Sequence, residues 1–366
     1  MRITLLGAGH IGQTIARLLH ACGDYAVTVV DRDAAALHRL AASGLATRIA
    51  DTGDAATLGA ALGATGCDAV VNALPHCLAI AAATAAREAR CHYFDLTEDV
   101  AATRAIQALA GGADTAFMPQ CGLAPGFVGI VAHHLARGFE VLHDVKMRVG
   151  ALPAFPTNAL KYNLTWSVDG LINEYCHPGE AILDGRRIEL LPLEGLEHFS
   201  LDGIEYEAFN TSGGLGTLCA TLEGRVQRLD YKSVRYPGHR ALMKMLLDDL
   251  GLARDPATLK DLLRKSVPAT MQDVVLVFVT VSGLRGGALV QEVFARKIFA
   301  DRAAALPLSA IQITTAAGLC AALDLFREGK LPACGFIRQE QVELPAFLAN
   351  RFGRAYTASR QVESIC

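Results

Sequence analysis

Short apolar runs rich in β-branched residues alternate with Ala- and Leu-rich helical patterns over residues 1 to about 120. This rhythm is typical of a parallel sheet wound with helices, because strands buried on both faces are continuously apolar and each crossover needs a helix. Six strands are predicted, at residues 3–6, 26–30, 47–50, 69–72, 92–95 and 115–118. We expect the first part of the chain to form a doubly wound domain.

The pattern changes after the glycine- and proline-containing stretch 122–126. A helix is predicted over 127–137, and alternating strands with few helices between them then follow, at 141–150, 185–191, 218–222, 226–231, 274–282 and 288–299. Such spacing indicates a mixed or antiparallel sheet, one face of which is covered by helices such as 239–250 and 259–264. An Ala-rich helix over 314–327 is expected to return to the first domain.

The expected fold class is therefore α/β: a doubly wound parallel sheet of the Rossmann type, with a second α+β domain built on a mixed or antiparallel sheet. The first domain is predicted to cover residues 1–125, with a return segment at 310–366. Residues 126–309 are predicted to form the second domain, which would bind the substrate and mediate dimerisation. A length of 366 residues exceeds what one hydrophobic core usually fills, which also favours two domains.

A glycine turn follows the first predicted strand and opens the first helix, as Gly7-Ala8-Gly9-His10-Ile11-Gly12. Gly7 permits the tight turn, Gly9 lets the backbone approach a pyrophosphate, and Gly12 lets the helix pack closely on its strand. The phosphates would meet the N–H groups of His10 and Ile11 at the positive end of the helix dipole. The spacing predicts a dinucleotide site.

Asp31 ends the second predicted strand, 24 residues after Gly7. A carboxylate at this place can accept hydrogen bonds from the ribose hydroxyls, whereas a 2′-phosphate would face a like charge. NAD is therefore the expected cofactor. NADP stays possible because the neighbouring Arg32 could accommodate a phosphate.

Other polar or turn residues follow the predicted strands of the first domain. Because ligands of such sheets lie at the carboxyl ends of the strands, these loops are expected to bind the cofactor. The alternative for Asp95, and for Thr97 beside it, is to cap the following helix. The additional cofactor-binding residues predicted in this way are Asp51, Asn72, Ala73, Pro75, Asp95 and Gly122.

Composition narrows the class of protein. Charged residues make up 19% of the chain and hydrophobic residues 52%, with a formal net charge of −3, which supplies no general attraction to nucleic acid or anionic membrane. The ten cysteines include no Cys-x-x-Cys pair and no cluster with metal-ligand spacing. We therefore expect reduced cysteines, no metal, a cytoplasmic location and, by default, a homodimer.

Four segments are too polar and too specific in residue type for ordinary strands: residues 160–175, 207–218, 231–239 and the loop 120–126. Within them lie the stretches Trp166-Ser167 through Asn173-Glu174-Tyr175, Phe209 to Leu215, and Arg235-Tyr236-Pro237-Gly238-His239. Together with the glycine turn, Asp31 and the stretch Pro119 to Gly126, they make the chain resemble the saccharopine dehydrogenase family. The resemblance runs almost end to end and is closest to the lysine 6-dehydrogenase branch.

The resemblance implies oxidation of a carbon–nitrogen bond with a nicotinamide cofactor. A lysine 6-dehydrogenase transfers hydride from the ε-carbon of L-lysine to NAD and releases ammonia after hydrolysis of the imine. The remaining semialdehyde cyclises to a piperideine carboxylate. An alternative within the family is saccharopine or another secondary amine as substrate. A third possibility, of another class, is a nicotinamide-binding sensor without catalysis.

Lysine brings a carboxylate and two ammonium groups to the site. Arg235 is predicted to bind the carboxylate, because its guanidinium fork matches two oxygens and stays charged. Thr211 and Ser212 precede two glycines whose backbone could face an anion, and Tyr162 is assigned to the same substrate site. The alternatives are an ion pair for Arg235 and a plain tight turn for Thr211 and Ser212.

Only a neutral ε-amine can release a hydride from its carbon, so the site needs a general base. His239 has an ordinary pKa near ~6.5 that suits this role, although it could simply start a helix. Lys161 could act as the base if it is buried, and would be a solvated charge if it is not. Glu174 could serve as base or ammonium partner, but the apolar spacing around it also fits the surface of a helix. The residues do not decide among the three.

Overall fold

A computed structural model describes residues 1–301 and 307–357 of the chain. The residues divide into two compact units. Unit 1 consists of Met1–Ile130 and Thr315–Ala355, and unit 2 consists of Val131–Thr314 with the described end of the chain after Ala355. No helix among the described residues is long and apolar enough to cross a membrane.

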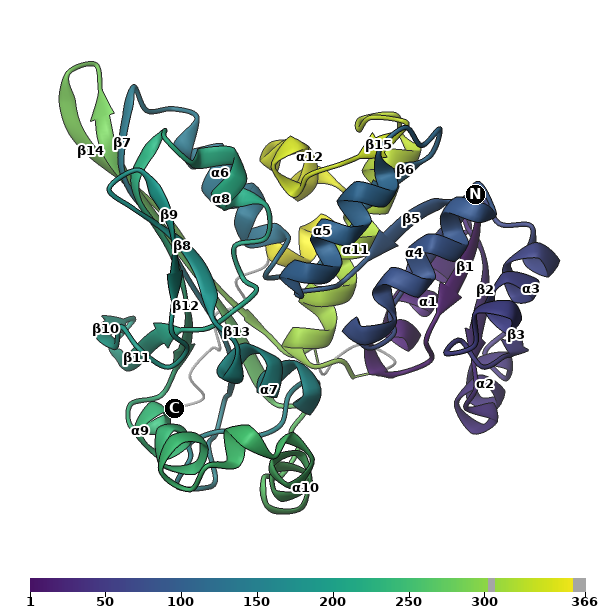
Figure 1. The fold of residues 1–366 in the computed structure, drawn as a ribbon, viewed down its shortest axis with the longest axis horizontal. Coiled ribbons are helices and arrows are strands. Elements are labelled where there is room, and N and C mark those ends of the chain that lie inside the picture. The colour runs from purple at the N-terminus through teal and green to yellow at the C-terminus, as the bar shows by residue number, and fades with distance from the viewer. Residues whose placement is uncertain (302–306, 358–366) are drawn as a thin grey trace, which may run out of the picture. The chain divides into compact units, whose positions relative to one another are not determined.

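Unit 1 is built on a seven-stranded sheet with the order β15-β6-β5-β4-β1-β2-β3, and every pairing in it is parallel (Figure 1). The strand order reverses beside β1, which is the feature that opens a ligand site at the carboxyl ends of such sheets. The strands are β1 (Arg2–Leu6), β2 (Ala26–Asp31), β3 (Ala46–Ile49), β4 (Ala69–Asn72), β5 (His92–Asp95), β6 (Ala116–Met118) and β15 (Gly335–Phe336). This arrangement confirms the predicted Rossmann-type fold class.

Most helices of unit 1 connect successive parallel strands, and the last three follow β15 at the end of the described chain. They are α1 (His10–Ala21), α2 (Ala34–Ala41), α3 (Ala55–Thr65), η1 (His76–Leu78), α4 (Ala79–Glu88), α5 (Val100–Ala110), η4 (Gln339–Gln341), α12 (Leu344–Ala349) and η5 (Gly353–Tyr356). Two further helices, α6 (Phe127–Ala136) and α11 (Ala310–Arg327), each begin in one unit and end in the other. The aspartates Asp33, Asp54 and Asp99 cap α2, α3 and α5, which satisfies backbone N–H groups of their first turns.

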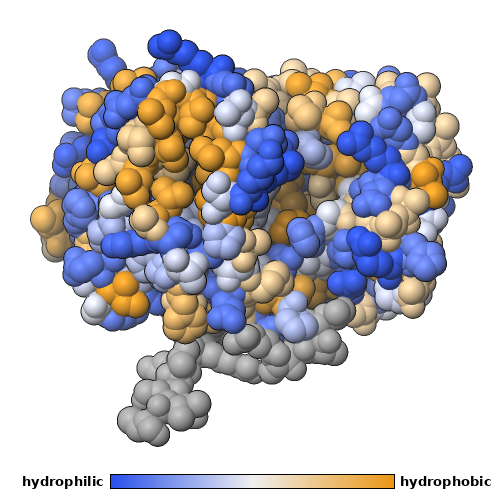
Figure 2. All heavy atoms as spheres, turned by 90° about the horizontal axis from the view of Figure 1, so that it is seen from below, coloured by the Kyte–Doolittle hydropathy of each residue, from blue (hydrophilic) through white to orange (hydrophobic). Residues whose placement is uncertain are grey.

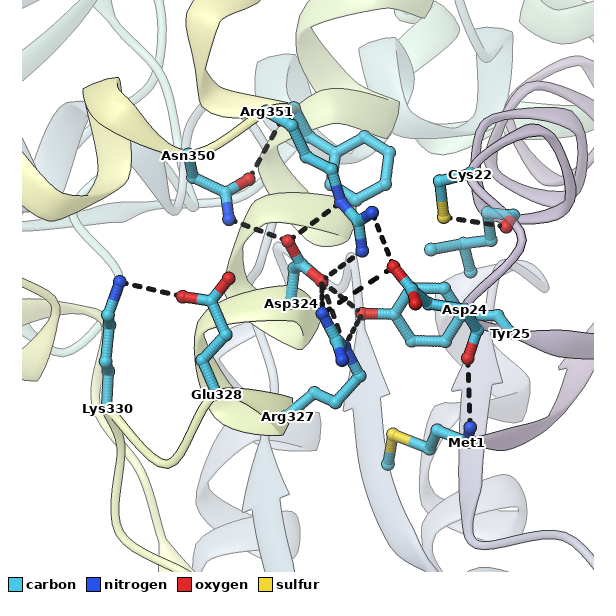
Figure 3. Close-up of polar contacts among 12 residues, drawn as sticks. Met1, Cys22, Asp24, Tyr25, Asp324, Arg327, Glu328, Lys330, Asn350 and Arg351 are labelled. Atoms are coloured by element: carbon cyan, nitrogen blue, oxygen red, sulfur yellow. Dashed lines mark hydrogen bonds and ion pairs between the residues drawn. The ribbon is translucent and has the colours of Figure 1, made fainter.

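The C-terminal part of unit 1 is fastened to its N-terminal part by one buried carboxylate, Asp324 (Figure 3). It accepts hydrogen bonds from the Tyr25 hydroxyl at 2.7 Å, Asn350 Nδ2 at 2.9 Å and Arg351 Nη2 at 2.7 Å, while Arg327 donates from the following turn of α11. Burial opposes the charge, but these hydrogen bonds lower the pKa of Asp324 to about 2. The return of the Ala-rich helix to the first domain is thus held by paired charges.

Unit 2 is built on a mixed sheet with the order β10-β11-β12-β7-β13-β14; β8 also pairs with β12, and β9 pairs with β8. β12 runs parallel to β7, whereas β13 is antiparallel to both β7 and β14. The strands are β7 (Val141–Pro153), β8 (Gly179–Leu183), β9 (Arg186–Leu190), β10 (Glu197–Leu201), β11 (Ile204–Asn210), β12 (Val226–Arg235), β13 (Asp273–Arg285) and β14 (Ala288–Phe299). The mixed sheet confirms the second half of the predicted fold class.

Helices pack on one part of this sheet around a core that includes Phe209 and Tyr175. They are α7 (Val168–Cys176), α9 (His239–Lys244), η2 (Met245–Asp249), η3 (Leu252–Arg254) and α10 (Pro256–Ser266), whereas the short helix α8 (Leu218–Leu222) lies against β8. Trp166 packs against the same core, half-buried, which agrees with a core role for the single tryptophan.

The sequence prediction for residues 218–222 was wrong. The segment forms α8 rather than a strand, with Leu218, Cys219 and Leu222 buried on one side. Gly213 and Gly216 adopt positive φ just before it, so the chain turns too sharply to enter the sheet. The strands β8, β10 and β11 were not predicted from the sequence.

β14 lies at one edge of the mixed sheet and carries exposed apolar side chains, with Leu289 72% and Val293 50% exposed. Figure 2 shows hydrophobic residues gathered toward the left of its view, amid hydrophilic ones. An exposed apolar edge strand is a feature through which protein chains associate. The homodimer expected from the sequence stays a prediction.

Candidate functional site

The glycine turn between β1 and α1 has the geometry that its sequence predicts. Gly7 has a φ of +103°, and a Cβ on it would lie 2.9 Å from the carbonyl oxygen of Ala73. A Cβ on Gly12 would lie 2.0 Å from the carbonyl oxygen of Gly7, whereas one on Gly9 would meet nothing within 4 Å. Gly7 and Gly12 are therefore required by packing, and the space at Gly9 is open for a ligand.

Backbone donors at this turn are available to an anion. The first hydrogen bond inside α1 runs from the amide of Gln13 to the carbonyl of Gly9, so the amides of His10, Ile11 and Gly12 have no partner within the helix. These N–H groups stand at the positive end of the helix dipole. The free amides and the open space at Gly9 make the turn suitable for the pyrophosphate of a dinucleotide.

Asp31 at the end of β2 is fixed against the glycine turn. Its Oδ2 accepts a hydrogen bond from the amide of Ala8 at 2.5 Å, and its Oδ1 accepts one from the amide of Asp33 at 2.8 Å. The carboxylate is half-buried, whereas Arg32 beside it is exposed. A negative charge is thus held rigidly where the adenosine ribose of a bound dinucleotide would lie.

The buried polar residues at the ends of β4 and β5 form one network. Asn72 donates to the hydroxyl of Tyr93 at 3.0 Å and accepts from the amide of Leu74, which shapes the loop beside the glycine turn. Asp95 accepts from Tyr93 at 2.9 Å and from the amides of Thr97 and Gln120 at 3.0 and 2.9 Å. Burial raises the pKa of Asp95 to about 6.

The polar atoms of this network form hydrogen bonds to one another and to loop amides. Asn72 and Asp95 therefore fix the shape of the loops that follow β4 and β5. Tyr93, which joins them, was not predicted from the sequence; its position two residues before Asp95 on the same strand was the available signal. The carboxylate that caps α5 is Asp99, and Thr97 accepts a hydrogen bond from its amide.

The other predicted cofactor residues lie in the loops of unit 1. Asp51 is exposed and accepts a hydrogen bond from the amide of Gly53. Ala73 and Pro75 follow β4, and the backbone of Ala73 packs against Gly7. Gly122 bridges to Gly126 in the loop after β6. Their contact with a cofactor stays a prediction.

In unit 2, Arg235 ends β12 inside a group of aromatic side chains. Only 3% of its surface is exposed, and its guanidinium carbon lies 5.2 Å from the ring centre of Tyr162 and 5.7 Å from that of Tyr175. It donates hydrogen bonds to the Tyr175 hydroxyl at 2.9 Å and to the carbonyl of Val234 at 2.8 Å. No carboxylate among the described residues forms an ion pair with it.

A chain of hydrogen bonds fixes the orientation of Arg235. Nδ1 of His239 lies 2.9 Å from the carbonyl oxygen of Leu160, which can only accept, so Nδ1 carries the proton. Burial is the main cause that lowers the pKa of His239 to about 3, and the nearby charge of Arg235 is the second. The ring is therefore neutral, and its Nε2 accepts a hydrogen bond from the Tyr175 hydroxyl at 3.1 Å. Tyr175 in turn accepts from Arg235.

Both nitrogens of His239 are therefore occupied, and the residue is fully buried. These facts favour a positioning role for His239 over the proton-accepting role expected from the sequence. The turn that carries it is held by Glu207, whose carboxylate accepts from the amides of Gly238 at 2.8 Å and Arg240 at 2.6 Å. Glu207 was not predicted, because a single glutamate in a strand gives no sequence signal.

The loop that contains Tyr162 holds three buried polar atoms without a hydrogen bond of normal geometry among the described residues. They are the Tyr162 hydroxyl, Oδ1 of Asn163 and Oγ1 of Thr165. Burial raises the pKa of Tyr162, while the charge of Arg235 opposes that rise. Trp166 and Thr165 lie beside the Tyr162 hydroxyl and also act to lower its pKa, so the loop supplies part of its own polar environment.

The remaining residues predicted for this site have different positions. Lys161 is exposed, and its Nζ donates to the carbonyl of Pro237 at 3.0 Å, which is contrary to the buried amine that a base would need. Glu174 is buried on α7, and its charge acts on Arg235, Tyr162 and Tyr175.

Thr211 and Ser212 form the turn after β11. Thr211 exchanges a hydrogen bond with Ser233 at 2.8 Å, and Ser212 donates to the carbonyl of Asn173 at 3.3 Å. Their hydroxyls therefore fasten the turn to β12 and α7, in the structural role that the sequence left open. Asp169, the other acidic residue of the stretch before Tyr175, pairs with Lys260 at 2.6 Å on the surface. Among the described residues, no group of three or more metal-ligating side chains is found.

Comparisons with known proteins agree with this two-part organisation. The model of the saccharopine dehydrogenase NADP binding domain matches residues 3–116, and that of the saccharopine dehydrogenase C-terminal domain matches residues 122–346. The structure of apo saccharopine dehydrogenase (L-Glu forming) from Saccharomyces cerevisiae is similar in fold, with a TM-score of 0.77 and 17% identity over 94% of this chain and 96% of that chain. A myo-inositol dehydrogenase from Corynebacterium glutamicum has a TM-score of 0.46 and 15% identity over 98% and 97% of the two chains. The chain belongs to the saccharopine dehydrogenase family and is an NAD(P)-dependent oxidoreductase of that family.

Proposed function

We propose that this oxidoreductase is an NAD-dependent amino-acid dehydrogenase that oxidises the ε C–N bond of L-lysine. The observation that carries the proposal is the buried guanidinium of Arg235, which has no carboxylate partner among the described residues. The buried Glu174 acts on Arg235 through its charge but forms no ion pair with it, so the unfilled guanidinium points to a ligand that brings a carboxylate into direct contact.

Arg235 is well prepared for this task. A guanidinium has five N–H donors, of which Tyr175 and Val234 take two, so three are left for a ligand. The bond to Tyr175 fixes the plane of the fork, and the fork matches two carboxylate oxygens. Arg235 would therefore bind and orient the carboxylate of the amino acid, with Tyr162 completing the wall beside it.

The reaction also requires an uncharged ε-amine. Among the three residues expected as bases, Lys161 is exposed and His239 is buried and neutral with both nitrogens engaged. Glu174 is buried, and its charge is felt by the groups around Arg235. We assign to Glu174 the role of attracting a substrate ammonium, and a proton could then leave through its carboxylate.

NAD is preferred over NADP because of Asp31. The aspartate is held by the amides of Ala8 and Asp33, so it cannot turn away from a 2′-phosphate without breaking two hydrogen bonds. When bound, the cofactor accepts the hydride. The protein groups that would hold it are the amides of the glycine turn and the carboxylate of Asp31.

Saccharopine is the second candidate, because the matching family models and the yeast structure carry its name. Saccharopine brings more carboxylates than lysine and needs more cations. In unit 2, Lys232 is paired with Glu197 at 2.9 Å and Lys161 donates to a backbone carbonyl. Arg235, by contrast, forms no ion pair with a carboxylate of the described residues, and a single cation of this kind favours the substrate with one carboxylate.

The test is an assay of the purified protein with NAD and NADP separately, against lysine, saccharopine, ornithine and diaminopimelate. The expected result is lysine-dependent formation of reduced NAD at alkaline pH, with a much smaller rate for NADP. Activity with saccharopine and none with lysine would overturn the proposal in favour of the second candidate. Binding of NAD with no turnover of any amine would support the sensor.

A further inference from the structure

Two cysteines of unit 1, far from the residues discussed so far, lie with their sulfur atoms in contact. Cys67 precedes β4 and Cys91 precedes β5, and these strands are neighbours in the parallel sheet. Their Sγ atoms are 3.2 Å apart, so a movement of about 1 Å would bring them to the length of a disulfide bond. Both thiols are free in the structure.

We propose that Cys67 and Cys91 form a redox-sensitive dithiol, which a hydroperoxide converts reversibly into a disulfide. Cys67 is the attacking residue and Cys91 the resolving one. The site is a modification site and is independent of the substrate of the enzyme.

The surroundings differentiate the two thiols. The hydrogen bond with Cys91 is the largest of the influences that lower the pKa of Cys67, while the pKa of Cys91 is raised by the same contact and by burial. A thiolate is the nucleophilic form of cysteine, so Cys67 reacts first. Both residues are buried, and Cys67 is the more exposed of the two, at 9% against 3%.

The chemistry is balanced with a hydroperoxide as oxidant. The Cys67 thiolate attacks one peroxide oxygen, the O–O bond breaks, and the other oxygen leaves as an alcohol or water after taking a proton. The Cys91 sulfur then attacks the sulfenic sulfur of Cys67, the S–O bond breaks, and water leaves with the Cys91 proton. Two thiols lose two electrons, and the peroxide gains them.

Other cysteines of unit 1 lack this combination. Cys121 and Cys320 are fully buried, and burial raises the pKa of each thiol. Cys77 and Cys334 are exposed and Cys22 is half-buried, and none of the three has another sulfur within hydrogen-bonding distance among the described residues. Because the pair lies at the amino ends of β4 and β5, the new bond is at the opposite end from Asn72 and Asp95. We therefore expect NAD binding to survive oxidation.

The experiment uses the whole protein, reduced, freed of reductant and treated with a few equivalents of hydrogen peroxide. Remaining thiols are blocked with N-ethylmaleimide, and the unreduced digest is analysed by mass spectrometry. The expected result is a cross-link between the peptides of Cys67 and Cys91 within one chain, which dithiothreitol reverses. If N-ethylmaleimide labels both Cys67 and Cys91 at a peroxide dose that oxidises other thiols, the two have stayed reduced and the proposal is overturned. A cross-link from either residue to another cysteine would also overturn it.

Two variants assign the roles. In Cys91→Ser, the sulfenic acid on Cys67 has no resolving thiol and should be captured by dimedone. In Cys67→Ser, Cys91 should remain unlabelled at the same dose. Cys77→Ser is the matched control and should retain the cross-link in full. Equal dimedone labelling of Cys67 and Cys91 in the two variants would contradict the assigned order of attack.

Discussion

Two arginines of unit 2 are equally buried and differ in what surrounds them. Arg148 on β7 and Arg235 at the end of β12 are each 3% exposed, and the two strands are direct neighbours. Arg148 is enclosed by carboxylates: it pairs with Glu197, and its Nη1 lies 2.7 Å from Oδ1 of Asp230. Arg235 has a phenol oxygen, a backbone carbonyl and two aromatic rings.

The comparison separates a structural charge from one that is prepared for a ligand. Glu197 and Asp230 neutralise the charge of Arg148 within the folded protein, so Arg148 has a structural role and needs no ligand. The hydrogen bonds of Arg235 orient its guanidinium without neutralising it. A carboxylate supplied by a substrate would give Arg235 what Arg148 already has.

The largest effect on stability is expected at Arg148. Arg148→Met removes the guanidinium and leaves Asp230 without its partner, so the free energy of unfolding should fall by about 2 kcal/mol. This is less than the loss of about 3–5 kcal/mol for a fully buried pair, because the carboxylate side chains of Glu197 and Asp230 are 36% and 28% exposed. Urea denaturation measures it. A variant as stable as the wild type would show that this pairing contributes little.

The pH dependence of stability tests the surroundings of Arg235. The pKa of His239 is lowered to about 3, so between about pH 6.5 and pH 3 the unfolded chain binds a proton that the folded protein does not. The free energy of unfolding should therefore decrease as the pH falls, by about 1.4 kcal/mol per pH unit for this residue.

His239→Gln should remove this component of the slope, as measured by denaturation at pH 7.5, 6.5 and 5.5. Asp95 and Asp273 have the opposite effect, because burial raises the pKa of each to about 6 and the folded protein then binds the extra protons. Both aspartates are present in both proteins, so the difference between the two profiles isolates His239. Parallel profiles would contradict the neutral, buried imidazole.

A smaller effect is expected at Tyr175. Tyr175→Phe removes the acceptor of Arg235 and the donor to His239 but keeps the ring. The loss of these hydrogen bonds should lower the free energy of unfolding by about 1 kcal/mol. Because the guanidinium is no longer oriented, the KM for the amino acid should rise by about fivefold. Steady-state kinetics measure this change, and an unchanged KM would remove Tyr175 from the positioning role.

The sequence was most informative where local spacing decides the structure. The glycine turn and Asp31 follow from steric demands within a short stretch of chain, and the strands of unit 1 are continuously apolar. The second domain was harder, because Leu218 and its neighbours form an apolar run that fits either a strand or a helix. The glycines before that run decide for the helix.

The candidate site could likewise be predicted only as far as local sequence allows. The sequence could name Arg235 and His239 from their chemistry, but their surroundings depend on contacts between distant segments. The bond from His239 to Leu160 joins residues 79 positions apart, and it makes the histidine a neutral positioning residue. The contact of Cys67 with Cys91 likewise exists only because β4 and β5 are adjacent.

The most direct test of the central claim is the KM for the amino-acid substrate in Arg235→Met, measured beside Arg148→Met. The two substitutions remove the same chemical group from two equally buried positions. The account predicts an increase of about 10–100-fold for Arg235→Met, from loss of charge-assisted hydrogen bonds, with the KM for NAD nearly unchanged. Arg148→Met should leave both constants close to those of the wild type. An unchanged amino-acid KM in a folded Arg235→Met protein would contradict the assignment of Arg235 to the substrate carboxylate.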